Sequence, residues 1–126
     1  MVTEALATLD RAQTTIDPRL DTAHRMIALY NEQDADGYVA LMTDDACEAT
    51  YRGAMLREGR EGVRSGLKAM FAQFPQNRAD ILSSDVLGET VVLHETVARA
   101  PDGEKFEVMS IYSFSGDKVD RVEFIR

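Results

Sequence analysis

The sequence predicts an α+β fold in one domain of residues 1–126, with three N-terminal helices packed on a strongly bent antiparallel sheet. Apolar residues recur mainly at helical spacing up to Pro75, and the remainder shows the period-2 pattern of strands. This segregation favours an α+β fold over alternating strand–helix units. A length of 126 residues suits one domain, and an apolar fraction of 44% is ordinary for a folded protein.

Capping residues and proline mark the helices. Thr3 is the expected cap of a short helix in residues 3–13, within a peripheral segment 1–16. Asp17 and Pro18 indicate a stronger start, because aspartate accepts from free backbone N–H groups and proline needs none. Pro75 ends the most amphipathic segment. The three helices of the fold are expected in residues 17–31, 34–42 and 60–74.

Alternating segments separated by turn residues indicate strands. Glycine and proline lie in the three connections after residue 79, and such short turns join antiparallel neighbours. The segment 52–59 is expected to be a loop. Strands are expected in residues 46–51, 79–87, 90–99, 105–115 and 118–125.

Neither face of the expected sheet is cleanly polar. In segment 105–115, Phe106 and Tyr112 share one face, whereas Met109 and Ile111 lie on the other. The helices cover one face, and the sequence contains no further helix for the second. We therefore expect a homodimer through the outer face of the sheet.

Charge and composition exclude several classes of partner. With 14 Lys+Arg and 22 Asp+Glu, the net charge of −8 disfavours nucleic acid and anionic membrane surfaces. No apolar run approaches the roughly 20 residues of a membrane span. The N-terminus has no basic leader or apolar signal core, and Cys47, the one cysteine, forms no internal disulfide. These features predict a cytoplasmic protein.

No metal or cofactor is expected. His24 and His94 lie in separate segments without zinc-ligand spacing, and the acidic residues in 34–45 are better explained as caps and loop residues. The glycines do not form a phosphate-binding loop.

Four stretches carry a resemblance to a known family. They are NEQDADGYVALMTDDA from Asn31, GREGVR from Gly59, DGEKF from Asp102 and FSGDKV from Phe114. The chain from Arg19 onward resembles the nuclear transport factor 2-like superfamily, in particular its SnoaL-like and ketosteroid isomerase-like branches. The resemblance implies a cone-shaped, cystatin-like α+β roll. It leaves the activity open, because this fold hosts isomerases, cyclases, epoxide hydrolases, dehydratase-like proteins and non-enzymatic binding proteins.

The same resemblance argues against steroid isomerisation. Ketosteroid isomerases use a tyrosine, a general-base aspartate and a protonated aspartate. In register, these positions hold Met26, Thr50 and Ser110. A thioether does not donate a hydrogen bond, and neither hydroxyl is a base at neutral pH.

His94 is the expected general base, because imidazole titrates near neutrality. The superfamily register turns His94 into the pocket, where Glu48 would orient it and Tyr30 or Tyr112 would donate to an oxyanion. A structural histidine and packing tyrosines are the alternative roles.

The apolar alternation of the same strand argues for the opposite orientation. Val91, Leu93 and Val97 make its odd-numbered face the more apolar one, which would turn His94 outward. We follow the superfamily register and expect His94 to face the pocket.

The expected pocket is apolar with few polar groups, which suits a small hydrophobic molecule bearing one or two oxygens. We expect cofactor-free proton transfer on such a molecule, of isomerase, cyclase or hydrolase type; the alternative is a non-catalytic binding or dimerisation module. The expected lining, besides His94, Tyr112 and Glu48, is Met26, Tyr30, Leu41, Thr50, Leu67, Met70, Phe71, Val92, Thr96, Ser110, Phe114, Val122 and Phe124.

Overall fold

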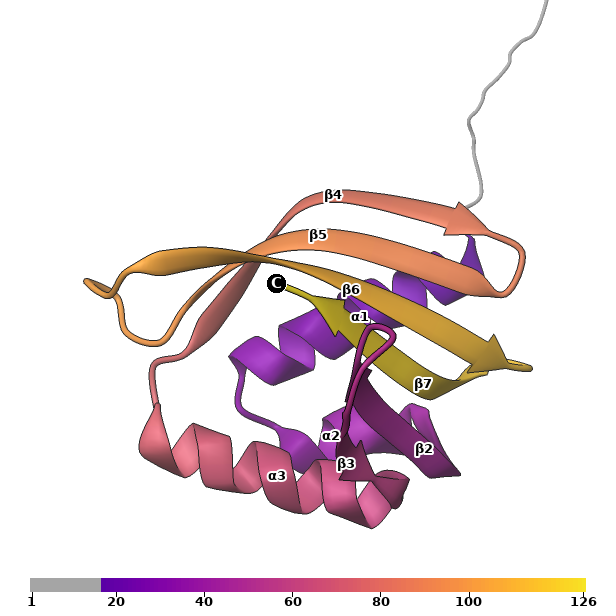
Figure 1. The fold of residues 1–126 in the computed structure, drawn as a ribbon, viewed down its shortest axis with the longest axis horizontal. Helices are drawn as coiled ribbons and strands as arrows, with labels where there is room; N and C mark the ends of the chain where they lie inside the picture. The colour runs from indigo at the N-terminus through magenta and orange to yellow at the C-terminus, as the bar shows by residue number, and fades with distance from the viewer. Residues whose placement is uncertain (1–16) are drawn as a thin grey trace, which may run out of the picture.

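Three helices and a six-stranded sheet make up the part of the chain that the structure, a computed structural model, describes, residues 17–126 (Figure 1). The helix expected in residues 1–16 lies outside the described residues. The helices are α1 (Pro18–Asn31), α2 (Ala35–Ala40) and α3 (Gly59–Gln73). The strands are β2 (Met42–Thr50), β3 (Met55–Glu58), β4 (Arg78–Leu87), β5 (Thr90–Ala98), β6 (Lys105–Ser115) and β7 (Lys118–Ile125).

The predicted α+β architecture is confirmed, with two corrections to the sheet. Its strand order is β3-β2-β7-β6-β5-β4, and β2 pairs parallel with β7, whereas the other neighbours are antiparallel. The sheet is mixed rather than purely antiparallel. A parallel pair is possible here because most of the chain lies between β2 and β7, whereas a tight turn would force antiparallel pairing. The expected loop 52–59 contains β3, which forms a hairpin with β2.

The start of α1 follows the predicted capping chemistry. The Asp17 carboxylate accepts from the Arg19 backbone N–H at 2.9 Å, and Pro18 occupies the first turn. The short second helix ends earlier than expected, and Met42 begins β2.

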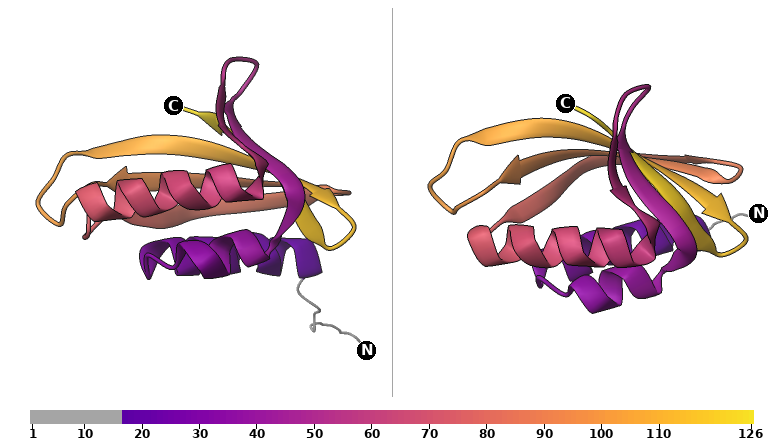
Figure 2. Two further views of the ribbon diagram at one scale, coloured as in Figure 1. Left: turned by 90° about the horizontal axis from the view of Figure 1, so that it is seen from below. Right: turned by 60° about the horizontal axis from the view of Figure 1, so that its bottom comes forward.

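Every second residue of β5 is buried, and these residues define the concave face of the sheet. Val91, Leu93, Glu95 and Val97 are buried, while the residues between them are partly exposed. All three helices lie on one side of the bent sheet, and the β2–β3 hairpin projects away from them (Figure 2). The apolar face of α3 packs here through residues one helical turn apart, which include Val63.

No helix of residues 17–126 is long and apolar enough to span a membrane.

Asn31 joins the end of α1 to the start of β4. Its Nδ2 donates to the Ala79 carbonyl, and its Oδ1 accepts from the Ala79 N–H, both at 2.8 Å. Because Ala79 is buried, Asn31→Ala leaves both backbone groups without this partner, and we expect a loss of about 2 kcal/mol in the free energy of unfolding. Urea titration measures it. The exposed Gln73→Ala is the control, and equal midpoints for the two variants would contradict the assignment.

Candidate functional site

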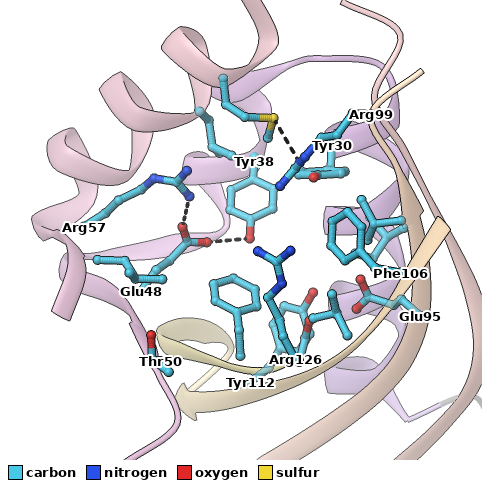
Figure 3. A pocket seen from close by; sticks show the side chains of 18 residues that line it. Tyr30, Tyr38, Glu48, Thr50, Arg57, Glu95, Arg99, Phe106, Tyr112 and Arg126 are labelled. Atoms are coloured by element: carbon cyan, nitrogen blue, oxygen red, sulfur yellow. Dashed lines mark hydrogen bonds and ion pairs between the residues drawn. The ribbon is translucent and has the colours of Figure 1, made fainter. Parts of the chain in front are cut away.

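A cavity of about 380 Å³ lies between the concave face of the sheet and the helices. Apolar side chains from α1, α3 and the strands form much of its wall, and Figure 3 shows the polar groups that project into it. The tyrosine, acidic and arginine side chains of the lining are Tyr30, Tyr38, Glu48, Arg57, Glu95, Arg99, Tyr112 and Arg126.

Glu48 is a buried carboxylate that is held by two donors. It is 1% exposed, and its Oε2 accepts from the Tyr38 hydroxyl at 2.9 Å. Its Oε1 pairs with Arg57 Nη1 at 2.5 Å, directly across the β2–β3 hairpin. Burial, followed by the charge of Glu48, raises the pKa of Tyr38 well above its usual range. Tyr38 therefore remains a hydrogen-bond donor at neutral pH.

The absence of a side chain at Gly66 gives Arg57 its place. A Cβ atom there would lie 2.3 Å from Arg57 Nε and 2.6 Å from Cδ. The Arg57 side chain thus lies against α3 at a position that has no side chain. Movement of Arg57 would leave Glu48 buried with one partner fewer.

Glu95 is the second buried carboxyl group of the cavity, and it is not neutralised in the same way. It is 4% exposed, and its Oε2 has no hydrogen-bond partner among residues 17–126. Burial raises the pKa of Glu95 to about 7, against smaller lowering effects of a hydrogen bond from Ser110 and of the His94 charge. This carboxyl therefore accepts and releases protons near neutrality.

Tyr30 and Tyr112 are the other two phenol groups of the cavity lining, besides Tyr38. Burial raises the pKa of both, and for Tyr112 the charge of Glu95 is the next contribution. Both phenols therefore stay protonated at neutral pH and can donate to an oxygen of a bound molecule.

The prediction that His94 faces the pocket is wrong. His94 lies on the opposite face of β5, where its Nε2 is 2.6 Å from Glu107 Oε1 on β6. Val92 and Thr96 share that face and also lie outside the cavity lining. The reason is the strand period: the apolar odd-numbered residues turn to the helices, so the even-numbered ones turn away. Pairing of two copies through this outer face stays a prediction.

Several other predicted residues do meet in the cavity. Those that line it are Tyr30, Glu48, Thr50, Leu67, Met70, Ser110, Tyr112 and Phe124. Four predicted lining residues, Met26, Phe71, Phe114 and Val122, belong instead to the closed core, and Leu41 packs against that core. There the helices contact the sheet directly, and side chains fill the space between them.

Sequence reasoning missed Glu95 as well as Arg57, Arg99 and Arg126. A signal for Glu95 was present, because it is the one charged residue on the apolar face of its strand. The arginines had no such signal, since their places depend on long-range pairing. Among residues 17–126, no group of three or more His, Cys, Asp or Glu side chains could hold a metal ion.

The chain belongs to the SnoaL-like domain family, whose model matches residues 23–122. Among solved structures, it is 56% identical to a cystatin-fold protein of Novosphingobium aromaticivorans, with a TM-score of 0.82 over 86% of this chain and 97% of that one. A protein of Jannaschia sp. described as a SnoaL-like polyketide cyclase is 15% identical, with a TM-score of 0.72 over 92% and 90% of the two chains. That second likeness shows the fold alone. No curated protein matches the chain in sequence.

Two glycines of α3 provide a matched test of the Arg57 position. A Cβ at Gly62 meets only one backbone atom, at 3.9 Å, so Gly62→Ala should stabilise the protein by about 0.5–1 kcal/mol through helix propensity. Gly66→Ala displaces Arg57 from Glu48 and should be destabilising despite the same propensity gain. Chemical denaturation compares the two, and equal stabilisation by both would show that the Arg57–Glu48 pair does not depend on a glycine at position 66.

The raised pKa of Glu95 predicts a pH-dependent stability. The unfolded chain releases this proton near its usual pKa of 4.5 and the folded chain near 7, so folding is progressively disfavoured as the pH rises through that window. Relative to Glu95→Gln, the wild type should lose about 3 kcal/mol of unfolding free energy between pH 4.5 and 8. Parallel denaturation curves at these pH values measure the difference. A constant difference would mean that Glu95 ionises normally in the folded state.

Proposed function

We propose that the protein is an enzyme that moves a proton on a small hydrophobic molecule bearing oxygen, with Glu95 as the general base and acid. One observation carries the proposal: a buried carboxyl group in the cavity wall whose Oε2 has no hydrogen-bond partner among residues 17–126. A carboxylate in such surroundings is a stronger base than one in water, and it is also able to return the proton.

The cavity suggests how such a transfer would proceed. The Glu95 carboxylate takes a proton from a carbon next to a carbonyl, and the electron pair moves onto the carbonyl oxygen. We assign the Tyr112 hydroxyl as the donor to that oxyanion. It lines the same cavity, and burial together with the charge of Glu95 raises its pKa and keeps it protonated. Glu95 then delivers the proton to another atom of the enolate, so the reaction needs no outside acid.

Glu48 has a different part in this proposal. Its two oxygens already accept from Tyr38 and Arg57, which leaves it little freedom to accept a proton from a substrate. We assign it a positioning role. It keeps Tyr38 and Arg57 at the cavity wall opposite Glu95, as the two sides of Figure 3 illustrate.

Membership of the SnoaL-like family is compatible with proton transfer but does not determine which reaction the protein catalyses. One fold neighbour is described as a SnoaL-like polyketide cyclase, at an identity that supports comparison of the fold only. Isomerisation and cyclisation both begin with removal of a proton from carbon.

A neutral carbon acid tests the base directly. The chromogenic compound 5-nitrobenzisoxazole loses one proton from carbon while its N–O bond breaks, giving 2-cyano-4-nitrophenolate, and it requires only a base. We expect the wild type to accelerate this elimination with a kcat/KM that rises with pH through about 7, and Glu95→Gln to lower it about a hundredfold.

The matched control is Glu104→Gln, which makes the same change at an exposed residue outside the cavity lining and should leave the rate unchanged. An equal rate for Glu95→Gln and wild type would overturn the assignment of the base. Ligand binding without any turnover that depends on Glu95 would favour the non-catalytic binding module instead.

A further inference from the structure

The cavity contains more positive charge than its carboxylates neutralise. Arg57 is paired with Glu48, but no acidic group of residues 17–126 lies within ion-pair distance of Arg99 or Arg126. Both line the cavity. In a chain with a net charge of −8, two guanidinium groups at one cavity without an acidic partner in the described part of the chain require an explanation.

Both guanidinium groups lie over the ring of Phe106. The Arg126 Cζ lies 4.2 Å and the Arg99 Cζ 5.2 Å from the centre of its ring. A cation–π contact does not consume the five N–H donors of a guanidinium group, so those without another partner stay able to bind an anion. Figure 3 shows the Arg126 guanidinium directed into the cavity, toward Tyr38.

A hydrogen bond and a second cation–π contact hold the Arg99 side chain in place. Its Nη1 donates to Asn77 Oδ1 at 2.8 Å, and its guanidinium also lies over the Phe74 ring. Asn77 is itself buried. Arg99 is therefore preorganised, whereas Arg126 is exposed and supplies the second, more adjustable donor.

Arg99 and Arg126 line the same cavity as Glu95, and neither has an acidic partner among residues 17–126. The two arginines are therefore available for an anionic group of a bound molecule.

We infer that the substrate is a hydrophobic monoanion, such as an aromatic or polycyclic carboxylic acid, whose anionic group binds between Arg99 and Arg126. The inference deepens the proposed function and rests on it, since Glu95 would act on the apolar part of the same molecule. The planar N–H edges of guanidinium groups match the two oxygens of a carboxylate. The apolar wall accepts the ring system.

Two probes of nearly equal shape test the inference. 2-Naphthoate carries a carboxylate, and 2-naphthamide replaces it with a neutral amide. Calorimetric titration of the full chain should show that Arg126→Gln weakens binding of 2-naphthoate about tenfold and that of 2-naphthamide by less than about twofold. Arg126→Lys, which keeps the charge but loses the planar N–H edge, should retain only part of the affinity for 2-naphthoate.

Arg78→Gln is the control for net charge, because Arg78 is exposed on β4, is paired with Asp80 and lies outside the cavity. It should leave both affinities unchanged. Equal weakening of both probes by Arg126→Gln would overturn the inference, because Arg126 would then act only by packing. Unchanged binding of 2-naphthoate would overturn it as well.

Inhibition of the elimination reaction separates this inference from the proposed function. 2-Naphthoate should compete with neutral 5-nitrobenzisoxazole, with an inhibition constant about tenfold higher in Arg126→Gln. Binding without competition would place the anion outside the cavity and overturn the inference. If turnover does not depend on Glu95 but 2-naphthoate still requires Arg126, the proposed function fails and the anion site stands as a binding site. If turnover depends on Glu95 and the carboxylate gives no advantage, only the inference fails.

Discussion

The burial of the Glu48 carboxylate is the constraint on which the rest of the site depends. An ionised group without partners in a protein interior costs several kcal/mol, so its neighbours are not free to vary. Tyr38 from α2 and Arg57 from β3 supply the donors, and Gly66 of α3 provides the room for Arg57. One carboxylate thereby links two helices to the β2–β3 hairpin and fixes one wall of the cavity.

The two buried carboxyl groups differ in their surroundings, and this difference gives them different chemical capacities. Glu48 has a charged partner and a hydroxyl donor, whereas Glu95 has an oxygen without a partner among the described residues and a pKa raised by burial. A paired carboxylate organises its donors. An unpaired one is able to exchange a proton near neutrality. In this cavity, Glu48 therefore holds its neighbours in position, whereas Glu95 is the carboxyl group that is able to react.

The positions of His94 and Glu95 show how much depends on strand parity. They are adjacent in sequence, and a shift of one residue exchanges the group in the cavity for the group on the outer face. The apolar pattern of Val91, Leu93 and Val97 indicated the correct parity, and register with the superfamily indicated the wrong one. Burial of these three side chains against the helices outweighs any preference of one histidine, because each buried aliphatic side chain contributes roughly 1.5–3 kcal/mol.

The sequence by itself determined the α+β class, the three helices of the fold and most strand boundaries. These depend on capping, turn residues and periodicity, which act between near neighbours. Only the tertiary structure decided that β2 lies parallel to β7, that residues 55–58 form a strand, and that Arg57 and Arg126 reach one cavity. Contacts between such distant segments depend on strand order and on the bend of the sheet, and no local pattern encodes them. The sequence likewise does not show where the cavity ends and the closed core begins. In the structure, Met26 and Phe71 lie in the core and Tyr30 lies at the cavity wall.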